Sequence, residues 1–206
     1  MPVIAIIDYG VGNLRSVEKA LHNLGYEACV SNDSAVITQA DAVILPGVGA
    51  FAEGMERLQT EGMDKTVYRV VESGKPFIGI CLGMQLLFEY SEEGGKVKGL
   101  GILPGSIKRI PDSLHLKVPH IGWNKLDIVR DNPLLNQLTE NTYAYFVHSY
   151  YLEATHRQDV VCTTHYGIDI DVVVNRDNVY GTQFHPEKSS STGMKILDNF
   201  AKISIK

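Results

Sequence analysis

The sequence has few cysteines, no long apolar run and no leading basic segment, and each shortage excludes a class of protein. Its three cysteines, Cys29, Cys81 and Cys162, are an odd number at wide spacings, which argues against a disulfide framework or a zinc site. No stretch approaches the roughly 18 apolar residues of a membrane span. The opening residues, MPVIAIID, lack a positive region and predict a strand rather than a signal peptide. We therefore expect reduced thiols, a cytoplasmic chain and no membrane partner.

Basic residues are also in the minority. The chain has 19 Lys and Arg against 24 Asp and Glu, a net charge of −5, and no basic run that would neutralise a series of phosphates, so we expect no nucleic-acid partner. Hydrophobic residues make up 44% and charged residues 21% of the chain, which are near the averages for globular proteins. That composition supplies a sizeable core. We expect one domain over residues 1–206.

Apolar and amphipathic stretches alternate through the first half. Strand-like runs lie at residues 3–8, 41–45 and 76–80, and helical spacing follows at residues 14–24, 51–58, 63–71 and 82–90. The second half is rich in strands, at residues 123–129, 142–151, 160–166, 171–174 and 179–184, before a final helix at 192–203. This order predicts an α/β fold with a mostly parallel central sheet, flanking helices and an added antiparallel β section.

The sharpest local pattern is Gly79-Ile80-Cys81-Leu82-Gly83, placed where the third strong strand turns into a helix. This is the nucleophile-elbow pattern with Cys in place of Ser, in which small neighbours relieve crowding at a tight turn. A helix N-terminus behind Cys81 favours its reactive thiolate. The alternative is a buried structural cysteine, a common fate of a lone thiol. Cys29 and Cys162 lack flanking glycines, and we expect both in the core.

A thiol nucleophile needs a base, and His185-Pro186-Glu187 follows directly on a predicted strand. Residues two apart in an extended segment point the same way, so Glu187 is placed to orient the His185 imidazole. A loop histidine with a solvated glutamate is the alternative, which we would prefer if Cys81 were not upstream. His148 lies mid-strand, and we interpret it as a hydrogen-bonded core residue or pocket wall. No histidine pair has metal-ligand spacing, so we expect no metal and no cofactor.

Two glycine-bearing turns remain. The segment PGVGAF (residues 46–51) ends one strand and opens a helix, so its backbone N–H groups could serve a developing oxyanion. A plain strand–helix turn explains the same pattern. The segment GVGN (residues 10–13) lacks the full dinucleotide fingerprint and argues against nucleotide binding.

Several separated segments carry a family resemblance. GICLGMQ (79–85) together with HPE (185–187) resembles the class I, triad-type glutamine amidotransferases. Within that class, PGVGAF (46–51), HIGWN (120–124), FVHSY (146–150) and GTQFHPEKS (181–189) resemble the glutaminase subunits of imidazole glycerol phosphate synthase. The resemblance covers essentially the whole chain and shows no departure at a catalytic position.

The resemblance implies a glutaminase in which Cys81 attacks the side-chain amide of glutamine, His185 acts as base and Glu187 orients the imidazole. The oxyanion donors it implies are Val48, Gly49 and Leu82. The residues it implies for the amino-acid end of glutamine are Gln85, Glu93, Ser149 and Tyr150. Because Glu93 sits in an acidic loop, simple solvation is an equal alternative for its side chain.

The resemblance also implies a partner. Glutaminases of this family form a heterodimer with a (βα)8-barrel cyclase subunit, which uses the ammonia to make imidazole glycerol phosphate and aminoimidazole carboxamide ribotide in histidine biosynthesis. They are nearly silent until the partner's substrate binds, and Gly49 would let the Val48–Gly49 peptide rotate. The docking residues implied are Trp123, Asn124, Tyr145 and Lys188. The single tryptophan, Trp123, fits a core position equally well.

Other readings stay open at this stage. The same three catalytic residues would serve a glutaminase subunit for anthranilate, aminodeoxychorismate or pyridoxal phosphate synthesis, although PGVGAF and GWN argue against these. A non-catalytic thiol-sensing or interaction protein on the same fold is an alternative from another class, and an esterase or peptidase with the same elbow is a third.

Overall fold

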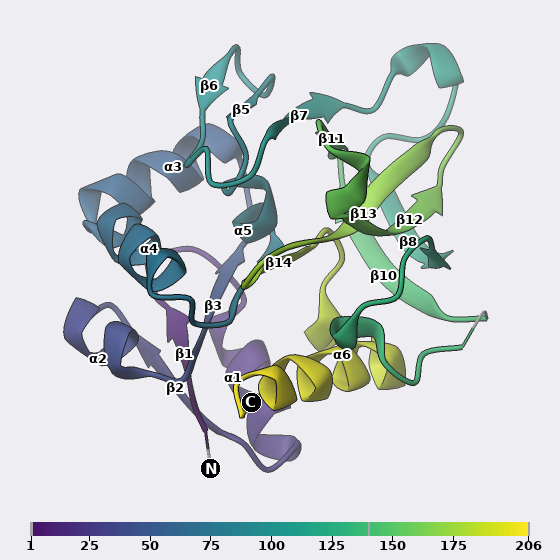
Figure 1. Cartoon of the computed structure of the whole chain (residues 1–206). Helices are drawn as coiled ribbons and strands as arrows, with labels where there is room; N and C mark the ends of the chain where they lie inside the picture. The colour runs from purple at the N-terminus through teal and green to yellow at the C-terminus, as the bar shows by residue number, and fades with distance from the viewer. Residues whose placement is uncertain (1, 140, 206) are drawn as a thin grey trace.

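A parallel centre made of apolar strands positions the other elements (Figure 1). The computed structural model describes residues 2–139 and 141–205, and these form a twelve-stranded sheet in the order β2-β1-β3-β4-β14-β13-β11-β7-β5-β6, with β12 paired to β13 and β9 to β12. The parallel strands are β1 (Val3–Ile7), β2 (Glu27–Ser31), β3 (Ala42–Gly47), β4 (Phe77–Cys81) and β14 (Val179–Thr182). Strands β3 and β4 are buried over their whole length, as a central strand covered on both faces must be.

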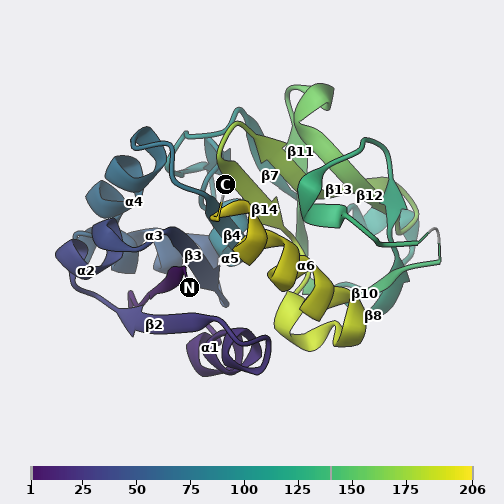
Figure 2. The same cartoon turned by 60° about the horizontal axis from the view of Figure 1, so that its bottom comes forward.

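Helices cover both faces of this centre (Figure 2). Apolar side chains of α1 (Leu14–Asn23) and α6 (Ser190–Ile203) join one core cluster. Those of α2 (Ser34–Gln39), α3 (Phe51–Thr60) and α4 (Met63–Glu72) join a second cluster. Successive residues of β1, β3 and β4 belong alternately to the two clusters, because neighbouring side chains along a strand point to opposite faces of the sheet. In the described part of the chain no helix is long and apolar enough to cross a membrane.

The second half adds an antiparallel section, as the sequence predicted. It contains β7 (Gly105–Arg109), β11 (Tyr150–Ala154), β12 (Val160–His165) and β13 (Asp169–Arg176), with the short strands β5 (Tyr90–Ser91), β6 (Val97–Lys98) and β9 (Asp127–Ile128). The β5–β7 pair is parallel, and the other pairs within this section are antiparallel. Strands β8 (His120–Lys125) and β10 (Tyr143–His148) form a separate two-stranded antiparallel ribbon. Four 3-10 turns complete the order within the described residues: η1 (Asp112–Leu114), η2 (Pro133–Leu135), η3 (Arg157–Asp159) and η4 (Pro186–Lys188).

Strand β14 differs from the prediction that grouped it with the antiparallel section. It pairs parallel with β4 on one side and antiparallel with β13 on the other. It is therefore the junction between the two parts of the sheet. Since β3, β4 and β14 are parallel neighbours, their carboxyl ends lie side by side. The segments that follow these three ends contain Val48, Cys81 and His185.

The helix predicted over residues 82–90 is wrong beyond its first turn, because α5 spans only Leu82–Gln85. The carbonyl groups that would continue the helix accept hydrogen bonds from another segment. Backbone N–H groups of residues 99–103 donate to the carbonyls of Leu86, Leu87, Phe88 and Glu89 at 2.8–3.0 Å. The apolar run is buried as predicted, but a neighbouring loop satisfies its backbone. Strands β2, β5, β6 and β7 and helix α2 were not predicted.

The turn from β4 into α5 lies directly against β3. At Gly83, any side chain would overlap the carbonyl oxygen of Leu45 in β3. At Gly79, a Cβ atom would lie 2.6 Å from the Gly83 carbonyl oxygen. The flanking glycines of the elbow are thus required by backbone-to-backbone contact, because a backbone oxygen cannot move aside as a flexible side chain can.

We expect Gly83→Ala to destabilise the fold by about 2 kcal/mol or more, since its methyl group must displace β3 or α5. Gly54→Ala in α3 is the matched control. Its methyl group meets only side-chain atoms of Leu82 and Leu86, the nearest being Leu82 Cδ2 at 2.9 Å, and alanine gains about 1 kcal/mol of helix propensity over glycine. Chemical denaturation of both variants measures the difference. Equal stabilities would contradict the packing argument.

Candidate active site

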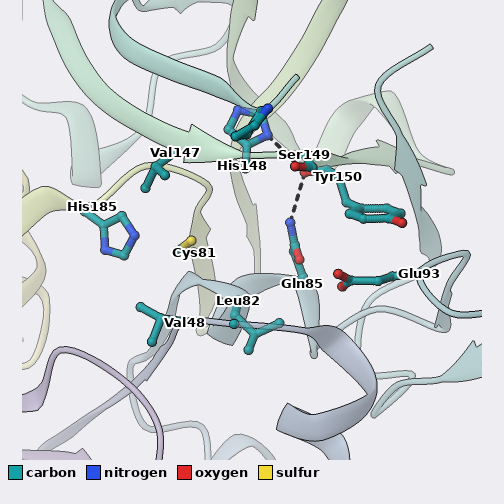
Figure 3. Close-up of a pocket in the computed structure, with 12 residues that line it drawn as sticks. Val48, Cys81, Leu82, Gln85, Glu93, Val147, His148, Ser149, Tyr150 and His185 are labelled. Atoms are coloured by element: carbon teal, nitrogen blue, oxygen red, sulfur yellow. Dashed lines mark hydrogen bonds between the residues drawn. The ribbon is translucent and has the colours of Figure 1, made fainter. Parts of the chain in front are cut away.

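A cavity of about 290 Å³ opens where β3, β4 and β14 end (Figure 3). Its walls contain nine residues that the sequence singled out: Val48, Gly49, Cys81, Leu82, Gln85, Glu93, Ser149, Tyr150 and His185. Glu187 lies behind His185, outside the lining. Pro119, Val147 and His148 complete the wall, and His148 is both hydrogen-bonded and part of the wall, as predicted. The structure therefore brings together segments that lie more than 130 residues apart.

Cys81 sits at the elbow between β4 and α5. Its backbone has φ 54° and ψ −113°, in a region that residues with side chains rarely occupy. Such strain persists only where surrounding structure enforces it, and it concentrates at functional sites. Here the close contacts of Gly79 and Gly83 enforce it. This backbone conformation directs the Cys81 sulfur into the cavity, although only 8% of the residue is exposed.

His185 is fixed on every side. Its Nδ1 lies 3.0 Å from Glu187 Oε1, and the two side chains are only 3% and 1% exposed. Asn13 Nδ2 donates to the same carboxylate oxygen at 3.2 Å, a contact that sequence reasoning missed. The His185 carbonyl accepts from Ser189 Oγ at 2.7 Å. Since Nδ1 is engaged by Glu187, Nε2 is the nitrogen available to Cys81.

The charge state of His185 follows from its partners. Burial lowers the pKa of His185, but hydrogen bonds to Cys81 and Glu187 and the negative charges of both raise it to about 10. The imidazole is therefore protonated at neutral pH, and the Glu187 carboxylate balances its positive charge.

An amide network borders the other side of Cys81. Gln183 Nε2 lies 3.9 Å from Cys81 Sγ, within hydrogen-bonding range for sulfur, and Gln183 Oε1 accepts from Gln85 Nε2 at 2.9 Å. Gln85 also donates to the Tyr150 carbonyl at 3.1 Å. Gln183 is fully buried, and no role was predicted for it from the sequence. The sequence signal that could have indicated a role for Gln183 was its place just after a buried strand and two positions before His185.

Glu93 is held rather than simply solvated. Its Oε2 accepts a hydrogen bond from the Phe51 backbone N–H at 2.8 Å, at the start of α3. Figure 3 shows the carboxylate directed toward Gln85 across the pocket. The acidic loop therefore places one negative charge at the end of the cavity away from His185.

The predicted oxyanion segment borders the cavity on its open side. Val48 is 40% exposed, and Gly49 has φ +96° with no atom within 4 Å of an added Cβ. Leu82 is the first residue of α5 and contacts the cavity from below Cys81 (Figure 3). All three residues line the cavity together with Cys81.

The four predicted docking residues lie on or beside the β8–β10 ribbon. Trp123 is 54% exposed, so it is not a core residue, and its ring meets Tyr145 edge-on at 6.1 Å. Asn124 and Tyr145 are half-buried. Lys188 is exposed in η4, and the η4 segment contacts β10. Ile121 and Tyr143 extend the exposed apolar surface of the ribbon, and contiguous patches of this kind are typical of interaction sites.

The remaining cysteines are away from this cavity. Cys162 is fully buried on β12, as predicted, whereas Cys29 on the edge strand β2 is only half-buried. Within residues 2–139 and 141–205, no group of three or more His, Cys, Asp or Glu side chains is arranged to hold a metal ion.

Comparison with known proteins agrees with the geometry. The family model for class I glutamine amidotransferases matches residues 5–203. The imidazole glycerol phosphate synthase subunit HisH of Caldanaerobacter subterraneus subsp. tengcongensis is 50% identical over 201 residues, which cover 98% of each chain. The subunit of the same name from Moorella thermoacetica is 51% identical over 203 residues, covering 98% of this chain and 96% of that one.

Solved structures share the fold at lower identity. A crystal structure of a glutamine amidotransferase superposes with a TM-score of 0.76 at 20% identity, covering 98% of this chain and 99% of the other. PurLQS from Thermotoga maritima gives 0.76 at 19% identity, covering 100% and 99%. The chain therefore belongs to the class I glutamine amidotransferase family and, within it, to the HisH subunits of imidazole glycerol phosphate synthase.

Proposed function

We propose that this chain hydrolyses glutamine through Cys81 and delivers the ammonia to a (βα)8-barrel cyclase, as the glutaminase subunit of an imidazole glycerol phosphate synthase in histidine biosynthesis. The observation that carries the proposal is the strained Cys81 facing a buried, hydrogen-bonded His185–Glu187 pair inside one cavity. Family membership supports the substrate and the pathway.

In the first half-reaction, the Cys81 thiolate attacks the side-chain carbonyl carbon of glutamine. The C–N bond breaks, and His185 donates its Nε2 proton to the leaving nitrogen, which departs as ammonia. A glutamyl thioester remains on Cys81. Glu187 stabilises the imidazolium before transfer and holds the neutral tautomer afterwards, since its contact is to Nδ1.

In the second half-reaction, water attacks the thioester carbonyl while His185 Nε2 accepts its proton. The C–S bond breaks, glutamate leaves and the thiolate–imidazolium pair is restored. Both half-reactions place negative charge on the substrate oxygen, and we assign its stabilisation to backbone N–H groups of Leu82 and of the Val48–Gly49 segment. These three residues line the cavity beside the sulfur.

The other end of the cavity suits the amino-acid end of glutamine. Glu93 supplies a carboxylate for the α-ammonium group, and its orientation is fixed by Phe51 N–H. Ser149 and Tyr150 lie opposite on the wall, where they can receive the α-carboxylate. Gln85 borders the space between them and is held by Tyr150 and Gln183.

Ammonia released at Cys81 must reach its acceptor before water protonates it, because ammonium has no lone pair for attack. We assign the β8–β10 ribbon as the surface on which the cyclase docks, with Trp123 as the central aromatic anchor. Tyr145 and Lys188 connect that surface to the His185 segment, since the His185 backbone N–H donates to the Tyr145 carbonyl at 3.4 Å. The cyclase would then receive ammonia through its barrel.

Cys81→Ala tests the division of labour between the two subunits. In the complex with the cyclase and its ribonucleotide substrate, we expect glutamate release and glutamine-dependent product formation to disappear while ammonia-dependent product formation persists. The matched control is Cys29→Ser, which alters a half-buried thiol outside the cavity and should retain both activities. Loss of both activities in Cys81→Ala would assign this residue a structural role.

Glu187→Gln tests the orientation of the imidazole. The amide cannot stabilise the imidazolium and can impose the wrong tautomer, so we expect kcat for glutamate release to fall about 10²- to 10⁴-fold. KM should change little, since Glu187 does not line the cavity. Glu92→Gln, an exposed change in the acidic loop, is the control. A kcat within twofold of the wild-type value would remove Glu187 from the catalytic set.

Trp123→Ala tests the docking surface. Truncating a central aromatic anchor weakens an interface by about 2 kcal/mol or more, so we expect the Kd for the cyclase to rise at least about thirtyfold. Val129→Ala is matched in exposure, at 54%, but follows β9 outside the ribbon and should bind normally. Titration calorimetry measures both constants. An unchanged Kd for Trp123→Ala would place the docking surface elsewhere.

A further inference from the structure

Two buried histidines form a hydrogen-bond chain behind the glutamine pocket that the triad does not use. His148 Nδ1 lies 2.9 Å from the Tyr150 carbonyl oxygen, and His148 Nε2 lies 3.0 Å from His120 Nδ1. The two residues are 6% and 3% exposed. His148 and Tyr150 line the cavity, whereas His120 stands one layer further out.

The hydrogen bonds that link His120, His148 and Tyr150 run in one donor-to-acceptor direction. A carbonyl oxygen only accepts, so His148 Nδ1 carries the proton and donates to Tyr150. Its Nε2 must then accept, which requires His120 Nδ1 to donate. His120 Nε2 is left as the acceptor for Asn124 Nδ2, at a longer 3.4 Å. The second amide hydrogen of Asn124 goes to the His165 carbonyl at 2.9 Å.

This direction requires both imidazoles to be neutral, because a protonated ring has no acceptor nitrogen. Burial lowers the pKa of each ring to about 4. The nearby groups that face the pair are carbonyls, an amide and aromatic rings rather than carboxylates. At neutral pH each imidazole therefore carries its single ring proton on Nδ1, and the hydrogen bonds keep this one direction.

The surroundings also hold His120 in one orientation. Its ring stacks on Phe146 at 5.0 Å and on Tyr166 at 4.0 Å, with interplanar angles of 17° and 21°. His120 and His148 are directly opposite each other in the β8–β10 pairing. A ring stacked on two aromatics and joined to its cross-strand neighbour has little freedom to turn.

The inner end of the chain meets the pocket at a single atom. The Tyr150 carbonyl oxygen accepts from both His148 Nδ1 and Gln85 Nε2, the latter at 3.1 Å (Figure 3). Both lone pairs of that oxygen are thus engaged. The outer end is Asn124, next to exposed Trp123 on the ribbon. One line of hydrogen bonds therefore joins the ribbon to the pocket wall.

We propose that His120 is a positioning residue for glutamine: through His148 it fixes the Tyr150 carbonyl and Gln85, and so sets the shape of the wall that receives the amino-acid end of the substrate. The inference rests on the proposed glutaminase function. It assigns His120 an effect on substrate binding rather than on the chemical step, because Tyr150 and Gln85 line the cavity directly. The connection onward through Gln183 reaches the Cys81 sulfur only at 3.9 Å, and the contacts that hold His185 are made by Glu187, Ser189 and Tyr145.

The test is His120→Phe, which keeps a ring for stacking but cannot donate to His148. In the complex with the cyclase and its ligand, we expect KM for glutamine to rise about tenfold, the effect of one lost hydrogen bond, with kcat within about twofold. His120→Asn places an amide N–H near the position of Nδ1, so it should restore much of the wild-type KM. Tyr166→Phe keeps the stack and removes only the bond to the Lys117 carbonyl, so its KM should not change.

A double-mutant cycle with His148→Asn isolates the link. Asparagine can still donate to Tyr150 but offers no acceptor where Nε2 stood, so His120→Phe should add nothing to KM in that background. If His120→Phe does not fold, the same KM increase is expected of His148→Asn alone. A lower melting temperature with unchanged KM, additive effects on KM, or a fall in kcat at constant KM would each overturn the proposal. Absence of glutamate release by the wild-type complex would instead contradict the proposed function.

Discussion

The close contact between the β4–α5 turn and β3 is the constraint on which the site depends. It holds Cys81 at a positive φ and requires glycine at Gly83, while the return of α5 onto β4 requires glycine at Gly79. The same contact presses α5 against the end of β3, so that the Val48 segment and the sulfur border one cavity. Because β14 is the other parallel neighbour of β4, His185 emerges on the opposite side of Cys81. Three adjacent strand ends thus position the proposed nucleophile, base and oxyanion segment, at the carboxyl edge where open parallel sheets commonly bind ligands.

The electrostatics of the site divide three buried histidines into two kinds. His185 faces a carboxylate and a thiol, and its pKa is raised to about 10. His120 and His148 face a carbonyl, an amide and each other, and burial lowers their pKa values to about 4. The same side chain is therefore a cation on one side of the cavity and a neutral donor–acceptor on the other. The hydrogen-bond and charge partners of each ring determine its charge state, since burial alone disfavours the charged form of all three histidines.

Local patterns in the sequence predicted the parts of this site that are determined locally. The elbow around Cys81 was predictable because strand, turn and glycine signals are short-range. Glu187 contacts His185 as expected, but from the 3-10 turn η4 rather than from the extended segment that the spacing argument assumed. The end of α5 was not, because the carbonyls after Gln85 are satisfied by residues 99–103, which a helical pattern does not reveal. The parallel pairing of β14 and the role of Gln183 likewise depend on partners about 100 residues away. The sequence around Trp123 was compatible with a core or a surface position. The structure decides for the surface, because one face of the β8–β10 ribbon is exposed.

Rigidity is unevenly distributed around the cavity. The side chains of Cys81, His185 and Glu187 are buried and contact several segments. On the opposite wall, hydrogen bonds join both His148 and Gln85 to the Tyr150 carbonyl. Residues 48–50 are exposed, and Gly49 has a positive φ with open space around it. Segments with few buried contacts are the ones that open at low free-energy cost. Conformational freedom in this site therefore belongs to residues 48–50, the proposed oxyanion segment, rather than to Cys81 or His185.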